Sequence, residues 1–373
     1  MPRKVLAVIG ALSNDTICIT REGLAGGSMI KSQKSVKELG GRAATIAVAA
    51  YRSCHQKPKD GTAAREDNED TNAPEIRAIG AVADEVRKKE FVTWLTDNGV
   101  NADGVRIKEG SSQDQDEEIS IYSAKEGTNM PLGQQGVSQN WTPEDFDDIE
   151  KVGGGSKPDL VVVTTELPRP VVQRIIDTAS SARVDVVVYS APAVLLGMRH
   201  FEKTTHLICS VGDAAEMLSY SRDEVDQYKW PEMRDDFYES KKVKNVVLKA
   251  GHFGSLYRNE DKEGIAFGYM KKKDVIDTYG ANSSFVGTYA MTLLESEDLN
   301  SWDVEAACGR ANKASALTAG TIGYKDAMPW RDQIDEFDSD QVYHDLSDLE
   351  EKPETGSLSW NHRRDRSNAS GGS

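Results

Sequence analysis

Short, fully apolar segments recur along the chain, and they limit its possible folds more than any other feature. The first covers residues 4–11, and similar segments follow at 76–83, 159–167, 184–192, 206–211 and 245–251. Between them lie amphipathic or alanine-rich stretches that predict helices, such as residues 41–53 and 169–182. Strands that are apolar on both sides need cover on both sides, so the pattern predicts an α/β fold with a mostly parallel central sheet between helices.

Two regions that break this pattern predict a small second sheet. Residues 16–36 and 117–132 alternate polar and apolar side chains, which is typical of strands with one face in water. Inserted into an α/β core, they suggest a lid over one edge of the main sheet. Residues 54–75 are polar and read as a surface insertion. Residues 350–373 read as a disordered tail, which leaves residues 1–349 as one domain.

The composition argues against several classes of partner. A net charge of −16 disfavours nucleic acid, whose phosphates need clustered Lys and Arg. No apolar run approaches the roughly 20 residues of a membrane-spanning helix. Residues 5–12 are as apolar as a short signal segment but lack a cleavage pattern, so we expect a cytoplasmic protein. The four cysteines are scattered without zinc-site spacing, and we expect no metal ligands among them.

Candidate site residues follow the predicted strands. In an open parallel sheet, ligands bind beside the carboxyl ends of the strands, where the following loops gather. The residues at such places are Asp15, Gly40, Gly41, Glu166, Gly251 and Gly280. Each is a weak signal alone, because a Gly-Gly before a helix is often a tight turn and a Glu after a strand is often a cap. Their order along the chain is the stronger evidence.

Taken in this order, the motifs resemble those of the PfkB family of carbohydrate kinases, in its ribokinase-like branch. VIGALSND at 8–15 is similar to the family's first strand with its sugar-binding Asp, and ELGGRAATIAVAAYR at 38–52 to its first signature. DVIDTYGANSSFVG at 274–287 resembles the second signature, usually D-T-x-G-A-G-D-x-F. TELPRP at 165–170 and VVLKAGHFGSLY at 246–257 are similar to its later strand ends. The resemblance extends from about residue 4 to about residue 335.

This resemblance implies a three-layer α/β/α sandwich with a β-sheet lid. It also implies ATP-dependent phosphorylation of a hydroxymethyl group on a sugar or nucleoside, with Mg²⁺ bridging the phosphates. ATP and Mg²⁺ are therefore the expected cofactors if the kinase activity is retained. In many members the lid also pairs subunits, so the resemblance implies a homodimer through the lid.

The resemblance also implies roles for individual residues. It places substrate binding at Asp15, Gly40, Gly41, Thr45 and Glu166, the anion hole at Gly280, Ala281 and Asn282, and nucleotide binding at Lys249, Gly251, Gly254 and Asn312. In the family scheme, the Asp of G-A-G-D removes the proton from the substrate hydroxyl.

The chain departs from the family pattern at its catalytic position. Ser283 stands where the family has this Asp, and Asn282 stands on the second Gly. A serine hydroxyl without a partner base cannot accept a proton near neutral pH, and general-base contributions are roughly 10²- to 10⁴-fold. Asp277 is a candidate substitute base, although a turn-stabilising role is the simpler interpretation. The family's N-x-x-E motif is also lost, with Ser210 or Val211 at its Asn.

Three interpretations follow from the sequence. The first is a kinase-derived protein that binds a sugar- or nucleoside-like ligand and transfers phosphate poorly, because of Ser283. The second is an active sugar or nucleoside kinase whose base comes from elsewhere. The third is an enzyme that uses the pocket for chemistry other than kinase chemistry, with Ser283 or Asp277 in a new role.

Overall fold

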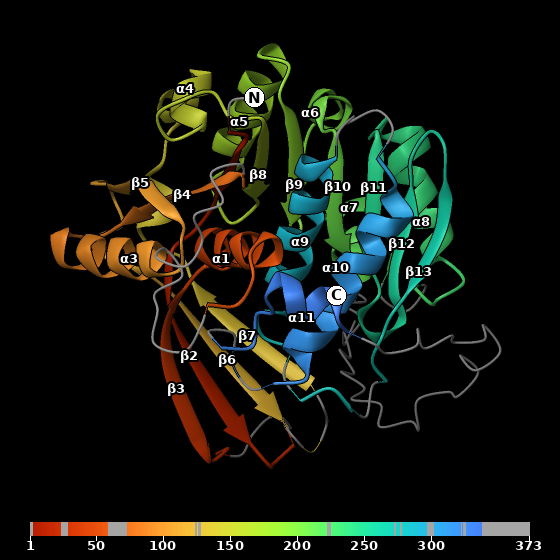
Figure 1. Cartoon of the computed structure of the whole chain (residues 1–373), viewed down its shortest axis with the longest axis horizontal. Helices are drawn as coiled ribbons and strands as arrows, with labels where there is room; N and C mark the ends of the chain where they lie inside the picture. Colours follow the sequence, from red (N-terminus) through yellow and green to blue (C-terminus); the bar gives the residue numbers. More distant parts are fainter. Residues whose placement is uncertain are drawn as a thin grey trace, which may run out of the picture. The chain divides into compact units, whose positions relative to one another are not determined.

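The centre of the part formed by residues 3–337 is a twisted sheet (Figure 1). The computed structural model describes residues 3–23, 29–58, 73–123, 125, 128–221, 225–271, 274–276, 278–296, 302–321, 323 and 326–337. Nine strands of this part form the central sheet, in the order β13, β12, β11, β10, β9, β8, β1, β4 and β5. They are β1 (Val5–Ile9), β4 (Glu75–Val82), β5 (Asn101–Ile107), β8 (Leu160–Thr164), β9 (Asp185–Ser190), β10 (His206–Ser210), β11 (Asn245–Lys249), β12 (Gly254–Arg258) and β13 (Glu263–Phe267).

The strands from β5 to β11 are parallel, whereas β12 and β13 are antiparallel. The predicted mostly parallel sheet is therefore confirmed, and all six predicted apolar strands are present in it. The strands that were not predicted are β5, β12 and β13, which lie toward the two edges.

Helices cover both faces of this sheet and enclose two hydrophobic cores. One face carries α1 (Arg42–Cys54), α3 (Glu85–Asp97), α9 (Ala281–Glu295) and α10 (Val304–Ala319), with α11 (Arg331–Asp335) beside them. The other carries α4 (Ile149–Val152), α5 (Arg169–Ser181), α6 (Met198–Lys203), α7 (Val211–Leu218) and α8 (Trp230–Asp235). In β1, Leu6 and Val8 belong to the first core, and Ala7 and Ile9 to the second. This alternation explains why the strand is apolar at every position.

A separate four-stranded sheet forms the lid. Its order is β3 (Lys34–Gly40), β2 (Ser13–Thr20), β6 (Asp116–Ser123) and β7 (Thr128–Gln134). Figure 1 shows it projecting away from the central sheet, beyond α1. The prediction of a lid from residues 16–36 and 117–132 is confirmed, but the first part is longer, because pairing extends to Ser13 and Gly40.

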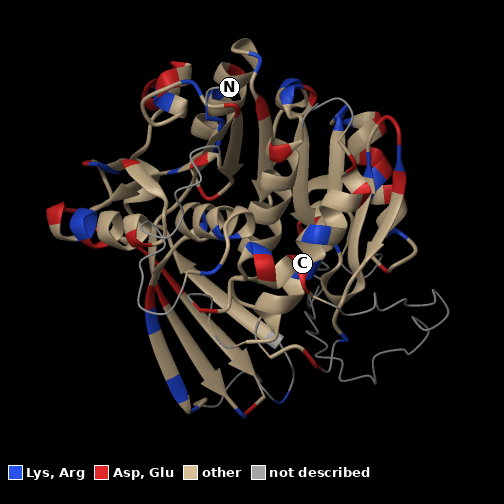
Figure 2. Ribbon diagram, in the orientation of Figure 1, with Lys and Arg blue, Asp and Glu red and all other residues tan. Residues whose placement is uncertain are grey.

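The predicted insertion at residues 54–75 is shorter at both ends. Helix α1 continues to Cys54 and β4 starts at Glu75, while residues 59–72 lie outside the described part. The predicted tail at 350–373 also lies outside it. Figure 2 shows acidic and basic residues interspersed on the outer helices, the loops and the lid. None of the helices in the described part has the length and apolar character needed to cross a bilayer.

Candidate active site

The first wall of the site forms where α1 begins. Its N-cap is Gly41, with a φ of +85° that L-residues rarely adopt. A Cβ at this position would lie 2.3 Å from the backbone oxygen of Ala11. Only glycine therefore lets the start of α1 approach the connection between β1 and β2. There the Gly41 N–H donates to Oδ2 of Asp15, at 3.3 Å.

Asp15 lies on β2 of the lid and is almost fully buried. The hydroxyl of Ser13 donates to its Oδ1 at 2.6 Å, and the hydroxyl of Tyr279 donates to its Oδ2 at 2.6 Å. Burial raises the pKa of Asp15 to about 7, although both of these hydrogen bonds act to lower it. A carboxyl with a pKa near neutrality is thus held by three donors.

A second carboxylate of the site is held by an arginine. Glu166 follows β8 and forms an ion pair with Arg42, the first residue of α1. The hydroxyl of Thr164 also donates to Glu166, at 3.2 Å, and the amide of Gln139 donates to the Glu166 backbone oxygen at 2.8 Å. Burial raises the pKa of Glu166, and the charge of Arg42 opposes this rise.

The N-terminus of α9 forms the opposite wall. Gly280 is its N-cap, with a φ of +79°, and the N–H of Ser284 closes the first turn onto the Gly280 oxygen. The N–H groups of Asn282 and Ser283 have no acceptor within the helix, as in every helical first turn. Free N–H groups and the helix dipole make such a terminus suited to an anion. Phosphate is the anion that the motif predicts here.

A hydrogen bond joins the two helix starts. Oγ of Ser283 lies 2.8 Å from Oγ1 of Thr45, and the Thr45 hydroxyl donates to the backbone oxygen of Gly41 at 2.9 Å. Because the proton of Thr45 is used in this second bond, Ser283 is the donor to Thr45. The Ser283 side chain is only 6% exposed, so its oxygen is held in one place.

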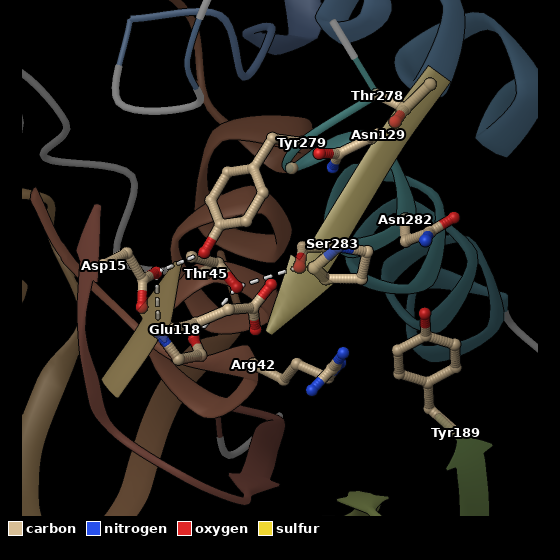
Figure 3. A pocket seen from close by; sticks show the side chains of 13 residues that line it. Asp15, Arg42, Thr45, Glu118, Asn129, Tyr189, Thr278, Tyr279, Asn282 and Ser283 are labelled. Atoms are coloured by element: carbon tan, nitrogen blue, oxygen red, sulfur yellow. Dashed lines mark hydrogen bonds between the residues drawn. The ribbon is translucent and has the colours of Figure 1, made fainter. Parts of the chain in front are cut away.

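These groups surround a pocket of about 250 Å³ (Figure 3). It is lined by Asp15, Gly41, Arg42, Thr45, Glu118, Asn129, Pro131, Tyr189, Thr278, Tyr279, Gly280, Asn282 and Ser283. Glu118 reaches it from β6 of the lid and is half-buried. Within the described part of the chain, the Glu118 carboxylate makes no hydrogen bond or ion pair.

A second pocket, of about 220 Å³, lies on the other side of α9. Its lining includes Lys249, Gly251, His252, Gly254, Ala281, Phe285 and Asn312. The Lys249 ammonium donates to Oδ1 of Asn282, and burial lowers its pKa to about 7. The Asn312 amide donates to the Ala266 backbone oxygen at 2.8 Å, so it ties α10 to β13 as well as lining the pocket. A mostly apolar pocket beside a cation is suited to a nucleotide base and its phosphates.

Comparison with known proteins identifies the family. The model for the "pfkB family carbohydrate kinase" family matches residues 3–331. The chain belongs to the pfkB family. Among curated relatives, the ribokinase of Schizosaccharomyces pombe is 24% identical over 341 residues, which cover 88% of this chain and 96% of that protein.

Solved structures of the pfkB family share the fold. The Arabidopsis thaliana ribokinase complexed with ribose and ATP superposes with a TM-score of 0.68 at 16% identity, over 89% of this chain and 97% of that one. The Burkholderia thailandensis nucleoside kinase in complex with inosine gives a TM-score of 0.65 at 15% identity, over 88% and 95%. The α/β ribokinase fold with a lid sheet is thereby established.

The magnesium ion expected of the family was tested against the donors that the chain offers. Ser210, the last residue of β10, and Asp213, in the first turn of α7, occupy the region of the family's N-x-x-E motif. The Ser210 hydroxyl donates to Oδ2 of Asp213 at 2.5 Å, and the Lys249 ammonium attracts the same carboxylate. The described residues contain no group of three or more His, Cys, Asp or Glu placed around a metal. One carboxylate that already faces a cation is a poor magnesium site.

The structure brings most of the predicted residues together. Asp15, Gly41, Thr45, Gly280, Asn282 and Ser283 line one pocket. Glu166 lines an adjoining cavity that shares Arg42 with it. Ala281, Lys249, Gly251, Gly254 and Asn312 line the pocket beyond α9. Gly40 lines none of these three cavities and instead pairs with Ser13 in the lid. Asp277 lies outside the described residues.

Sequence reasoning missed seven residues that line the first pocket: Arg42, Glu118, Asn129, Pro131, Tyr189, Thr278 and Tyr279. Arg42 directly follows the Gly-Gly pair, and Tyr279 lies inside the second signature, so both were adjacent to a recognised motif. Glu118 carries only the weak signal of a polar residue in an alternating strand. Tyr189 reads as part of an apolar strand, and its place in the pocket depends on the sheet order.

Proposed function

We propose that the chain binds a sugar- or nucleoside-like small molecule in the pocket between the lid and α9, and that it transfers phosphate poorly. Ser283, at the position of the family's base, carries this proposal. Related structures hold ribose with ATP, or inosine, and this supports a ligand of the same kind. ATP is the corresponding phosphate donor of any residual transfer.

The hydrogen bonds of Ser283 support a role in ligand binding over a role in catalysis. Its proton points at Thr45, so its lone pairs are available to accept a hydrogen bond from a ligand hydroxyl. To remove that proton it would have to become an oxonium ion, or first lose its own proton to a base. The described residues place no histidine or carboxylate in hydrogen-bond contact with Ser283 or Thr45.

Calorimetry and thermal unfolding of the full chain test this proposal. The ligands are ATP–Mg²⁺, ADP, D-ribose, inosine and related sugars and nucleosides. A ligand at about 100 times its Kd should add roughly 2.7 kcal/mol to the free energy of unfolding. We expect such a shift with one small molecule, together with slow or absent formation of its phosphate ester. Turnover of about 1–100 s⁻¹, which is typical of kinases, would contradict the proposal.

One observation favours an active kinase as a second candidate. Glu118 is a carboxylate of the same pocket and has no partner in the described part of the chain. It could accept the hydroxyl proton that Ser283 cannot.

Under this second candidate, Glu118→Gln should lower turnover by roughly 10²-fold or more, because the base is lost. Under the first proposal, Glu118→Gln changes the affinity for the ligand, and the already low turnover stays the same. Product formation from ATP and the bound sugar measures the difference. Glu22→Gln is the matched control, since Glu22 is an exposed acid of the lid region that lines none of the described pockets.

The lid also supports the proposal of a homodimer. Ile119, Met130 and Leu132 are 38%, 46% and 65% exposed, and Ile119 is paired directly with Leu132. Directly paired residues lie on the same face of a sheet. An apolar face next to the edge strand β7 is a natural surface for a second lid.

Leu132→Glu should convert the dimer to a monomer, because it places a charge in the centre of this apolar face. The mass in solution, measured by light scattering after size exclusion, checks this outcome. Val86→Glu is the matched control, since Val86 is 66% exposed on α3, outside the lid. A wild-type chain that is monomeric at all concentrations, or a Leu132→Glu chain that stays dimeric, would refute the proposed interface.

A further inference from the structure

The carboxylates in and beside the pocket between the lid and α9 differ in how many hydrogen-bond donors the protein already gives them. Oδ2 of Asp15 accepts from both Tyr279 and Gly41, and its Oδ1 accepts from Ser13. Glu166 is likewise held by Arg42 and Thr164. A ligand hydroxyl that approaches Oδ2 of Asp15 therefore competes with two donors that the protein already provides.

Tyr279 is the donor that a ligand meets first. It precedes the N-cap of α9, is half-buried, and lines the pocket. Figure 3 shows its ring at the edge of the pocket with the hydroxyl directed to Asp15. At 2.6 Å this is a short bond from a hydroxyl to an acid group, a class of hydrogen bond that is stronger than a neutral one. The other two donors, Ser13 and the Gly41 backbone, belong to the pocket wall.

We propose that Tyr279 determines specificity, its hydroxyl taking the place of a ligand hydroxyl at Asp15, so that the pocket favours deoxy sugars or deoxynucleosides. This inference rests on the proposed function, because it names the class of ligand that the same pocket takes. A hydroxyl facing Oδ2 of Asp15 would lose its hydrogen bonds to water and gain none there, unless it expelled Tyr279. A carbon without that hydroxyl loses nothing there and contacts the tyrosine ring.

The remaining hydroxyls of such a ligand have partners elsewhere in the pocket. Glu118 has acceptor capacity on the lid side, and Ser283 on the α9 side. Glu118 and Ser283 then accept hydrogen bonds from the hydroxyls of the deoxy ligand. The parent sugar differs from this ligand by the one hydroxyl that would face Asp15. An acceptor atom that already has two donors, as Oδ2 of Asp15 has, discriminates against a polar group beside it, because that group is buried without a partner.

The test compares ligands that differ by one hydroxyl. Calorimetry on the full chain measures Kd for D-ribose, 2-deoxy-D-ribose and 3-deoxy-D-ribose, and for adenosine with its 2′- and 3′-deoxy forms. We expect the wild-type chain to bind at least one deoxy compound as tightly as its parent or more tightly. Tyr279→Phe should shift that ratio toward the parent by about tenfold or more, because Asp15 regains a free acceptor. Tyr228→Phe removes the hydroxyl of an exposed tyrosine that lines none of the described pockets, and it should leave the ratio unchanged.

The possible results separate the inference from the proposed function. If the wild-type chain prefers the parent over every deoxy form, the inference is overturned, whatever the variant does. An unchanged ratio in a folded Tyr279→Phe chain also overturns it. If the Tyr279→Phe chain does not fold, the preference of the wild-type chain alone supports or overturns the inference. If none of these sugars and nucleosides binds the wild-type chain, the proposed function fails, and this inference fails with it.

Discussion

Replacing Ser283 with aspartate should raise the rate of phosphoryl transfer from ATP to the bound ligand by roughly 10²- to 10⁴-fold, the usual contribution of a general base. The helix start that would hold the phosphate is in place. The first turn of α9 offers its N–H groups to the phosphate, and the pockets on the two sides of this turn meet at Asn282. Phosphoryl transfer depends mainly on positioning and electrostatics, and this wall supplies both.

The surroundings of residue 283 can accept a carboxylate. An aspartate there would lie in the first turn of α9, where the helix dipole favours negative charge. Thr45 could turn its hydroxyl toward the new carboxylate. The Lys249 ammonium is also near, because it donates a hydrogen bond to Asn282, the preceding residue. The cost of burying the charge is thereby reduced, and we expect the variant to fold.

The control for this experiment is Ser283→Asn, which has the shape of aspartate but cannot take a proton. Formation of the phosphate ester of D-ribose or inosine, followed with labelled ATP, gives kcat/KM for all three chains. We expect a gain for the aspartate variant alone. Equal rates for Ser283→Asp and Ser283→Asn would mean that the pocket lacks more than a base, and that it now serves a function other than phosphoryl transfer.

The positions of the strands and helices were predictable because they depend on local pattern. In β1 and β8, continuous apolar residues reflect burial on both faces, and the end of α3 at Asn98 follows the Asn-Gly signal. Strands β12 and β13 were not predicted, because short antiparallel strands at a sheet edge carry neither a continuous apolar run nor a clear alternation. The pairing of β12 with β11, and of β13 with β12, is a property of the assembled sheet.

The glycines and Asp15 were predictable as site residues because the backbone at motif positions has strict requirements. Gly41 is an example, since its φ of +85° and the 2.3 Å approach to Ala11 admit no side chain. The partners of Asp15 and Glu166 were not predictable. Tyr279 is 264 residues from Asp15, and Arg42 is 124 residues from Glu166. Glu118 enters the pocket only because β6 pairs with β2 in a register that sets Glu118 opposite Asp15.

The second large effect concerns Asp15 and pH. The pKa of this carboxyl is about 7 in the folded chain, against 3.8 as its ordinary value, mainly because of burial. Between these two values the folded chain binds more protons than the unfolded chain, so the free energy of unfolding falls as pH rises. At 1.36 kcal/mol per pKa unit, Asp15 should make the chain about 3 kcal/mol less stable at pH 8 than at pH 5.

Asp15→Asn removes this titration. Urea unfolding of both chains between pH 5 and pH 8 should show the variant gaining about 3 kcal/mol relative to the wild type across the interval. Glu166 also has a raised pKa, but it is present in both chains, so the comparison cancels its contribution. If the free energies of unfolding of the two chains change in parallel with pH, Asp15 has an ordinary pKa. Its hydrogen-bond donors then lower the pKa as much as burial raises it. A difference of the expected size would mean that the fold sacrifices stability at neutral pH to keep a charged acceptor inside the pocket. Such a charge, which holds Tyr279 at the edge of the pocket, serves the site and not folding, which is the pattern expected of a site residue.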